Sequence, residues 1–222
     1  MKNELVVIGN PKSNIAEAIR TVRTNLQFSS VDEEIKTILV TSSVPSEGKS
    51  FISSNLAVAF AQNDSKVLIV DCDMRKGRVH KIFNVTNEKG LSNLLIDEVE
   101  DEFKHYIRKT KIDNLYILTM GTVPPNPSEL LDSIKNKLLI KVLKKKFDYI
   151  IFDGVPINGL TDSLIMARLV DKVVIVSALK QTKMELLENT KRSLQSVGAD
   201  IAGVIVNKTP AIHNNYYGHY YE

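Results

Sequence analysis

One short segment of the sequence has the residue types and spacing of a phosphate-binding loop. The segment SVPSEGKS follows an apolar run and fits the pattern G-x-x-x-x-G-K-[ST], except that serine replaces the first glycine. In such a loop, backbone N–H groups surround phosphate oxygens, the lysine adds a positive charge, and the last hydroxyl ligates Mg²⁺. We therefore assign these residues to nucleotide binding, mostly through their backbone: Ser43, Val44, Pro45, Ser46, Glu47, Gly48, Lys49, Ser50 and Phe51.

Two other apolar runs end in carboxylates. The run YIIFD ends in Asp153, and VLIVDCD ends in Asp71 and Asp73. An acid at the end of a buried strand beside such a loop typically holds Mg²⁺, directly or through water. Strand-terminal aspartates are also common helix caps, but ligands of open α/β sheets bind at the carboxyl edge, where all three acids would meet. We interpret them, together with Lys49, as one catalytic cluster.

Basic residues follow the pair of acids on VLIVDCD. A solvated helix face and the neutralisation of triphosphate charge explain them equally well; they are Arg75, Lys76, Arg78 and Lys81. Cys72 lies between the two acids and is interpreted as a packing residue, because successive strand residues point to opposite faces.

Short apolar runs alternate with amphipathic segments along the chain. The runs are β-branched-rich and continuous, which is typical of strands covered on both faces. The pattern predicts an α/β fold with a doubly wound, mainly parallel sheet and helices on both faces, as in P-loop NTPases. The predicted strands span residues 37–41, 67–71, 115–119, 149–153, 172–177 and 202–207, and the clearest helices span 49–62, 132–146, 161–169 and 183–197.

Segments at both ends lie outside this pattern. Residues 13–28 place Ile15, Ile19, Val22 and Leu26 on one stripe at helical spacing. Residues 1–207 are expected to form a single domain and residues 208–222, which lack periodicity, a flexible tail. The tail holds four of the seven tyrosines, namely Tyr216, Tyr217, Tyr220 and Tyr221.

Composition excludes several classes of protein. The 222 residues, 43% hydrophobic and 25% charged, suit a soluble domain, and a net charge of +3 is too small to favour a nucleic-acid partner. The single cysteine allows no internal disulfide, and no Cys/His cluster has zinc spacing. Since the sequence shows neither a signal peptide nor an apolar run near the ~18 residues of a span, we expect a cytosolic protein that reaches a membrane only through a partner.

The combined motifs resemble those of bacterial protein-tyrosine kinases of the capsule and exopolysaccharide type, whose cytoplasmic domain is a P-loop ATPase. The resemblance covers nearly the whole sequence. It is carried by TSSVPSEGKS, VLIVDCDMRK and YIIFDGVP, which match Walker A, A′ and B, by VPPNPSEL at residues 123–130 and by the tyrosine-rich end. Glu17, Arg20 and Arg23 also match the family's E-x-x-R-x-x-R self-association motif.

This resemblance implies a kinase that uses ATP and Mg²⁺ to phosphorylate the tyrosines of its own tail, between subunits. It implies Mg²⁺ ligation by Ser50 and Asp153, with Asp71 accepting the tyrosine proton and Asp73 near the metal or orienting the acceptor. The spacing leaves an exchange of roles between Asp71 and Asp73 open. Asn207 resembles the position that reads the adenine edge, although a strand-terminal turn residue is nearly as good an interpretation.

The resemblance also implies partners. It suggests a homo-oligomer, cyclic in form, a cognate tyrosine phosphatase, and work at the inner face of the cell membrane in polysaccharide synthesis, with no nucleic acid. Because the sequence shows no span, we expect a separate transmembrane activator protein.

Three positions depart from the family pattern. Ser46 stands where many members have glycine, Gly77 where proline is usual, and Gly154 and Val155 interrupt a small-residue and double-proline run. None of these changes removes a phosphate or metal ligand. We expect them to affect loop geometry and turnover.

Two alternatives belong to other functional classes. A partitioning or cell-division-site ATPase would share the fold, but those relatives typically carry a signature lysine where this chain has Val44. A scaffold that binds ATP without catalysis is disfavoured by the intact lysine, serine and three aspartates. Tyrosine phosphotransfer, measured against plain ATP hydrolysis, separates the three.

Overall fold

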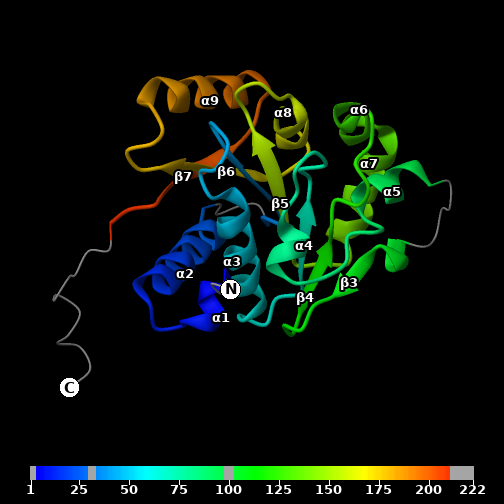
Figure 1. Cartoon of the computed structure of the whole chain (residues 1–222), viewed down its shortest axis with the longest axis horizontal. Helices are drawn as coiled ribbons and strands as arrows, with labels where there is room; N and C mark the ends of the chain where they lie inside the picture. The colour runs from blue at the N-terminus through cyan, green and yellow to red at the C-terminus, as the bar shows by residue number, and fades with distance from the viewer. Residues whose placement is uncertain (1–3, 30–33, 98–102, 211–222) are drawn as a thin grey trace.

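A seven-stranded sheet forms the centre of the molecule. The computed structural model describes residues 4–29, 34–97 and 103–210, in which the strand order is β3-β4-β2-β5-β1-β6-β7 (Figure 1). Neighbouring strands are parallel except β3 and β4. The strands are β1 (Thr37–Ser42), β2 (Val67–Asp71), β3 (Ile107–Lys109), β4 (Leu115–Leu118), β5 (Tyr149–Pro156), β6 (Lys172–Ala178) and β7 (Ile201–Asn207).

The predicted fold class is confirmed. The six predicted strands are β1, β2, β4, β5, β6 and β7, and β5 continues to Pro156, three residues beyond the prediction. Strand β3 was not predicted. It is a three-residue antiparallel edge strand with the sequence IRK, too short and too polar to give a periodic signal.

Helices cover both faces of the sheet (Figure 1). One face carries α1 (Val6–Gly9), α2 (Asn14–Gln27), α3 (Lys49–Ala61) and α4 (Val79–Ile82). The other carries α5 (Leu91–Ile96), α6 (Pro127–Asp132), α7 (Ile134–Lys144), α8 (Asp162–Ala167) and α9 (Met184–Ser196). The short helices α1, α4, α5 and α6, and the 3₁₀ turn at Phe103–His105, were not predicted, because six residues or fewer show too little of the helical period.

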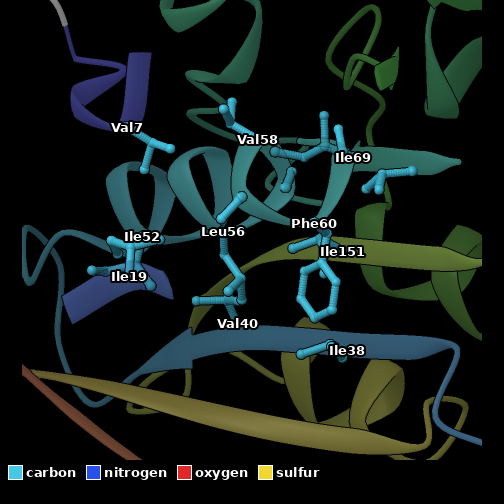
Figure 2. Packing of buried hydrophobic residues seen from close by; sticks show 14 of the residues in the cluster. Val7, Ile19, Ile38, Val40, Ile52, Leu56, Val58, Phe60, Ile69 and Ile151 are labelled. Atoms are coloured by element: carbon cyan, nitrogen blue, oxygen red, sulfur yellow. The ribbon is translucent and has the colours of Figure 1, made fainter. Parts of the chain in front are cut away.

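Helix α3 is buried on nearly every side. Leu56 and Phe60 point from it toward Ile38 and Val40 of β1, with Ile151 of β5 nearby (Figure 2). Burial of each large apolar side chain contributes about 1.5–3 kcal/mol. This packing fixes the start of α3 at the carboxyl end of β1, where the phosphate loop lies.

Helix α2 matches the predicted segment 13–28. Ser13 caps it, since its Oγ accepts a hydrogen bond from Ala16 N (3.2 Å). Of the four apolar residues placed on one stripe, Ile19 and Leu26 are buried and Val22 packs against the core. Ile15 does not share this burial, because its residue surface is 53% exposed, and Ala16 is the buried residue of the first turn instead.

The helix predicted over residues 132–146 is α7, which is shorter by two residues at each end. Ser133 has an extended backbone (φ −60°, ψ 152°) and separates α7 from α6, which ends at Asp132. Ser133 Oγ accepts a hydrogen bond from Asn136 N (3.1 Å), which caps the start of α7.

No helix in the three described ranges is both long and apolar enough to cross a bilayer. Of the predicted tail, the structure describes only residues 208–210. The four candidate acceptor tyrosines lie outside the described residues.

Candidate nucleotide and phosphoryl-transfer site

The predicted phosphate loop lies between β1 and α3. Gly48 has φ +100°, and a Cβ at this position would lie 2.1 Å from Asn207 Nδ2, so only glycine fits. Ser46 also has a left-handed backbone, with φ +65°. This conformation favours glycine, so the serine at position 46 holds it at a cost in strain.

Ser43 and Val44, at the start of the loop, make hydrogen bonds to other groups of the protein. Ser43 is fully buried, and its Oγ accepts a hydrogen bond from the Thr190 hydroxyl (2.9 Å). The Val44 N–H donates to Glu47 Oε2 (2.7 Å). The Val44 N–H is therefore used within the loop, and the assignment of the phosphate cradle to residues 46–50 stays a prediction.

Lys49 lies beside the predicted acids. It is 8% exposed, and burial lowers the pKa of its ammonium group, an effect opposed by the carboxylates of Asp153, Asp73 and Glu47. The predicted cluster of one lysine with acids from β2 and β5 is thus brought together. A triphosphate is the kind of ligand that this lysine is placed to meet.

Asp153 has the properties of a metal ligand. It is fully buried within β5, three residues before the strand ends, where Oδ1 accepts a hydrogen bond from Ser53 Oγ (3.0 Å) and Oδ2 has no hydrogen-bond partner among the described residues. Burial raises its pKa to about 6, against the opposing effects of the Ser50 hydroxyl and the Lys49 ammonium. A buried carboxylate oxygen without a donor, beside a serine hydroxyl, fits a hard cation such as Mg²⁺.

Asp71 lies in register with Asp153 on the neighbouring strand. Its Oδ1 accepts a hydrogen bond from Asp73 N (3.2 Å), and its Oδ2 accepts one from Val79 N (3.1 Å) at the start of α4. Burial raises the pKa of Asp71 well above its usual value, and the nearby Asp153 raises it further. A Cβ at Gly77 would lie 2.5 Å from Asp71 Oδ2, so the turn packs directly on this carboxyl group.

Asp73 is more accessible than Asp71. Its Oδ1 accepts hydrogen bonds from Arg75 N (3.1 Å) and Lys76 N (2.8 Å), which shapes the turn after β2. The residue is partly exposed, whereas Asp71 has no exposed surface. Cys72 is buried in the hydrophobic cluster on the opposite face, as interpreted from the sequence.

The structure adds one acid that the sequence reasoning missed. Asp162, at the start of α8, has a side chain that is 2% exposed and accepts hydrogen bonds from Arg75 Nε (3.1 Å) and the Ser128 hydroxyl. It therefore joins the turn after β2 to the start of α6. The VPPNPSEL motif signalled that residues 123–130 matter, but nothing in the sequence paired Ser128 with an acid 34 positions away.

Asn207 lies at the phosphate loop. Its Nδ2 donates to Glu47 O (2.8 Å), so one of its amide hydrogens is used to hold the loop. The remaining amide oxygen is the group that would meet an adenine edge. Both interpretations made from the sequence are therefore compatible with its position.

The residues of the self-association motif lie on α2. Arg20 Nη1 pairs with Glu17 Oε2 at 3.0 Å, the intrahelical geometry of a surface pair. Arg23 Nη1 donates to Ala59 O (3.2 Å), at the end of α3. Among the described residues, the Arg20 side chain pairs only within its own helix, whereas Arg23 also contributes to helix packing.

Comparison with known proteins identifies the family. The AAA domain family matches residues 35–203. CapB of Staphylococcus aureus is 41% identical over 98% of this chain and 94% of its own length, and the tyrosine-protein kinase YwqD of Bacillus subtilis (strain 168) is 36% identical over 99% and 92%. The solved kinase domain of the Escherichia coli tyrosine kinase ETK is 30% identical, with a TM-score of 0.86 over 96% of this chain and 84% of that domain. The chain belongs to the bacterial tyrosine-protein kinases.

The division-site ATPases share the fold of this tyrosine kinase at greater distance. The septum site-determining protein MinD of Pyrococcus horikoshii, solved with Mg-ADP, is 25% identical with a TM-score of 0.63, over 77% of this chain and 69% of its own. Identity, TM-score and coverage are all lower than for the ETK kinase domain. The comparison therefore favours the kinase prediction over the partitioning and division-site alternative.

Proposed function

We propose that this tyrosine kinase transfers the γ-phosphoryl group of ATP to the tyrosines of its own C-terminal tail, between subunits of a homo-oligomer. The observation that carries the site assignment is the buried Oδ2 of Asp153, which has no hydrogen-bond partner among the described residues and belongs to a carboxyl group near the Lys49 ammonium. A site with that composition binds a metal–triphosphate complex better than it binds a bare anion.

The nucleotide contacts follow from the loop geometry. The N–H groups of residues 46–50 surround the phosphates, the Lys49 ammonium neutralises their charge, and the side-chain oxygen of Asn207 reads the base. Mg²⁺ would be held by Ser50 and Asp153, with Asp73 adjacent, and would neutralise charge on the β- and γ-phosphates. Asp162 acts indirectly, because it fixes Arg75 at the same edge of the sheet.

The tyrosine hydroxyl gives its proton to the Asp71–Asp73 pair. In the transfer, the tyrosine oxygen forms a bond to the γ-phosphorus, the bond from that phosphorus to the β,γ-bridging oxygen breaks, and ADP leaves with the electron pair. Asp71 is the proposed proton acceptor, and burial raises its pKa well above the usual value. Asp73 is the more exposed of the two and orients the incoming hydroxyl near the metal.

The position of β7 supports the tail as the acceptor. Lys208, directly after β7, donates from Nζ to Ser46 O (2.8 Å) in the phosphate loop. The chain therefore leaves the fold beside the nucleotide site. A tethered acceptor has an effective concentration of order millimolar, and the proposed acceptors are Tyr216, Tyr217, Tyr220 and Tyr221.

The same proposal includes the cellular setting. The kinase assembles through Glu17, Arg20 and Arg23, in a ring, and a separate transmembrane activator brings it to the inner face of the cell membrane. There it regulates capsule or exopolysaccharide synthesis, and a cognate tyrosine phosphatase reverses the modification. An activator segment that orders the nucleotide loops would raise a low basal activity.

A mixing experiment tests the transfer between subunits. Lys49→Met removes the phosphate-binding charge but keeps the tail, and a second variant that ends at residue 210 keeps the site without the tail. Neither is expected to label itself with Mg·ATP, whereas the mixture should phosphorylate the Lys49→Met tail. Labelling of full-length protein with none in the mixture would restrict transfer to one chain, and labelling of Lys49→Met alone would remove the site assignment.

A further inference from the structure

Glu47 is a buried carboxylate inside the phosphate loop, and the mechanism above does not use its side chain. The residue has no exposed surface. Its Oε2 accepts a hydrogen bond from Val44 N (2.7 Å), and its Oε1 accepts hydrogen bonds from Ala178 N (3.1 Å) and the Thr182 hydroxyl. The side chain therefore joins the phosphate loop to the turn between β6 and α9, which is 131 positions away in the sequence at Ala178.

The hydrogen bonds to the Glu47 carboxylate belong to a strong class of hydrogen bond. A carboxylate is costly to bury unless donors surround it, and here one donor lies within the loop and two lie across from it. Hydrogen bonds to an ionised acceptor are roughly twice as strong as neutral ones. Since both oxygens are used, and on opposite sides, no neutral side chain of the same length can accept from Val44 and Ala178 together.

A second set of contacts holds the same loop through its backbone. Glu47 O accepts from Asn207 Nδ2 (2.8 Å), and Ser46 O accepts from Lys208 Nζ (2.8 Å). Lys208 Nζ also donates to Gln181 Oε1 (2.8 Å), in the turn after β6. The loop is therefore bound on one side by the turn after β6 and on the other by the end of β7.

We propose that Glu47 is a positioning residue, whose carboxylate fastens the phosphate loop to residues 178–182 and so presets the loop for nucleotide phosphates. Ser46 keeps its left-handed backbone next to this anchor, with φ +65°, which an unfastened loop would tend to relax. The Glu47 charge also favours the protonated form of Lys49. The inference deepens the proposed function at its nucleotide site and is independent of which tyrosine accepts the phosphate.

The test compares Glu47→Gln with variants of its partner Thr182. In Glu47→Gln, one oxygen becomes an amide that faces an N–H donor, so we expect the dissociation constant for Mg·ADP to rise roughly 10- to 100-fold. Thr182→Val removes only the hydroxyl donor and should weaken Mg·ADP binding less, by roughly 3- to 10-fold. Thr182→Ser retains the hydroxyl and should restore binding. Glu185→Gln, an exposed glutamate at the start of α9, is the matched control and should bind normally.

Two further measurements distinguish a loss of phosphate-loop positioning from a general loss of protein stability. Binding of Mg·pyrophosphate, which contacts the phosphate loop but has no base, should weaken by the same factor as Mg·ADP. In the double variant Glu47→Gln/Thr182→Val, the loss should be smaller than the product of the two single losses, because both changes act on one connected set of hydrogen bonds.

Several outcomes would overturn the inference. They are wild-type Mg·ADP affinity in folded Glu47→Gln or Thr182→Val, a pyrophosphate affinity that does not change, or losses that multiply in full in the double variant. If Glu47→Gln does not fold, the Mg·ADP affinities of Thr182→Val and Thr182→Ser still test the inference. If the variants change nucleotide affinity as expected but the wild-type protein labels no tyrosine, the proposed acceptor is wrong and the role of Glu47 stands.

Discussion

Asp71, the last residue of β2, pairs in register with Asp153 on the neighbouring parallel strand β5, so that two fully buried carboxyl groups lie side by side. Burial raises the pKa of both groups, and the charge of Asp153 raises that of Asp71 further. Such a pair is unfavourable for folding alone and becomes favourable when a cation is bound between the strands and the phosphate loop. Stability and function therefore make opposite demands at this edge of the sheet.

Asp153→Asn tests these opposite demands. The folded-state pKa of Asp153, about 6, lies above the unfolded value of 3.8, so the folded protein binds the extra proton between these values and loses stability as pH rises through them. At pH 7.5, without ligand, Asp153→Asn should therefore raise the free energy of unfolding by roughly 1–2 kcal/mol. The gain should shrink below pH 5, where wild-type Asp153 is protonated.

The same variant should lose the stabilisation that Mg·ADP gives to the wild-type protein. Thermal unfolding at several pH values, with and without Mg·ADP, measures both effects. A less stable Asp153→Asn apoprotein at pH 7.5, or an unchanged response to Mg·ADP, would contradict this assignment.

Asp71→Asn and Asp73→Asn should differ in a way that separates their roles. Asp71→Asn removes the proton holder, and we expect the rate of tyrosine transfer to fall ~10²–10⁴-fold with nucleotide affinity retained. Asp73→Asn should raise the Mg²⁺ concentration needed for half-maximal rate and slow transfer less. Single-turnover rates over a range of Mg²⁺ concentrations measure both, and the reverse pattern would assign the proton to Asp73.

Ser46→Gly should relieve backbone strain in the phosphate loop. Glycine adopts φ +65° without the steric cost that serine has, so we expect the free energy of unfolding to rise by about 0.5–1 kcal/mol. Ser65→Gly is the matched control, because Ser65 is not among the described residues with positive φ and the change should destabilise. Chemical denaturation measures both, and equal destabilisation by the two changes would show that the Ser46 backbone is not strained.

Arg20→Ala should dissociate the homo-oligomer without unfolding its subunits. The Glu17–Arg20 pair within α2 is worth only ~0.2–0.5 kcal/mol, so its loss leaves the fold intact. Arg23 is a poorer choice because its guanidinium also binds Ala59 O. Light scattering gives the assembly mass, with Arg192→Ala on α9 as the control; an unchanged mass for Arg20→Ala would assign the pair to helix stability only.

Strand positions and the phosphate loop were predictable because their signals are local. Continuous apolar runs and a Gly-Lys-Ser triplet can be recognised within ten residues, and the acids at strand ends meet because parallel strands share an edge. The contacts of Glu47 with Ala178 and of Ser128 with Asp162 were not predictable, since each joins segments far apart in the sequence. The exposure of Ile15 depends on how closely Ala16 packs, which periodicity does not determine.

The most direct test of the central proposal is the mass of the full-length protein after incubation with Mg·ATP, followed by mass spectrometry of its tail peptide. We expect successive additions of phosphate, all on the tail, which are lost in Lys49→Met and in the variant with Tyr216, Tyr217, Tyr220 and Tyr221 changed to Phe. Both variants should remain folded, and the tyrosine variant should bind Mg·ADP normally. ATP hydrolysis with an unmodified tail, or equal labelling of Tyr106, Tyr116 or Tyr149, would contradict the proposal.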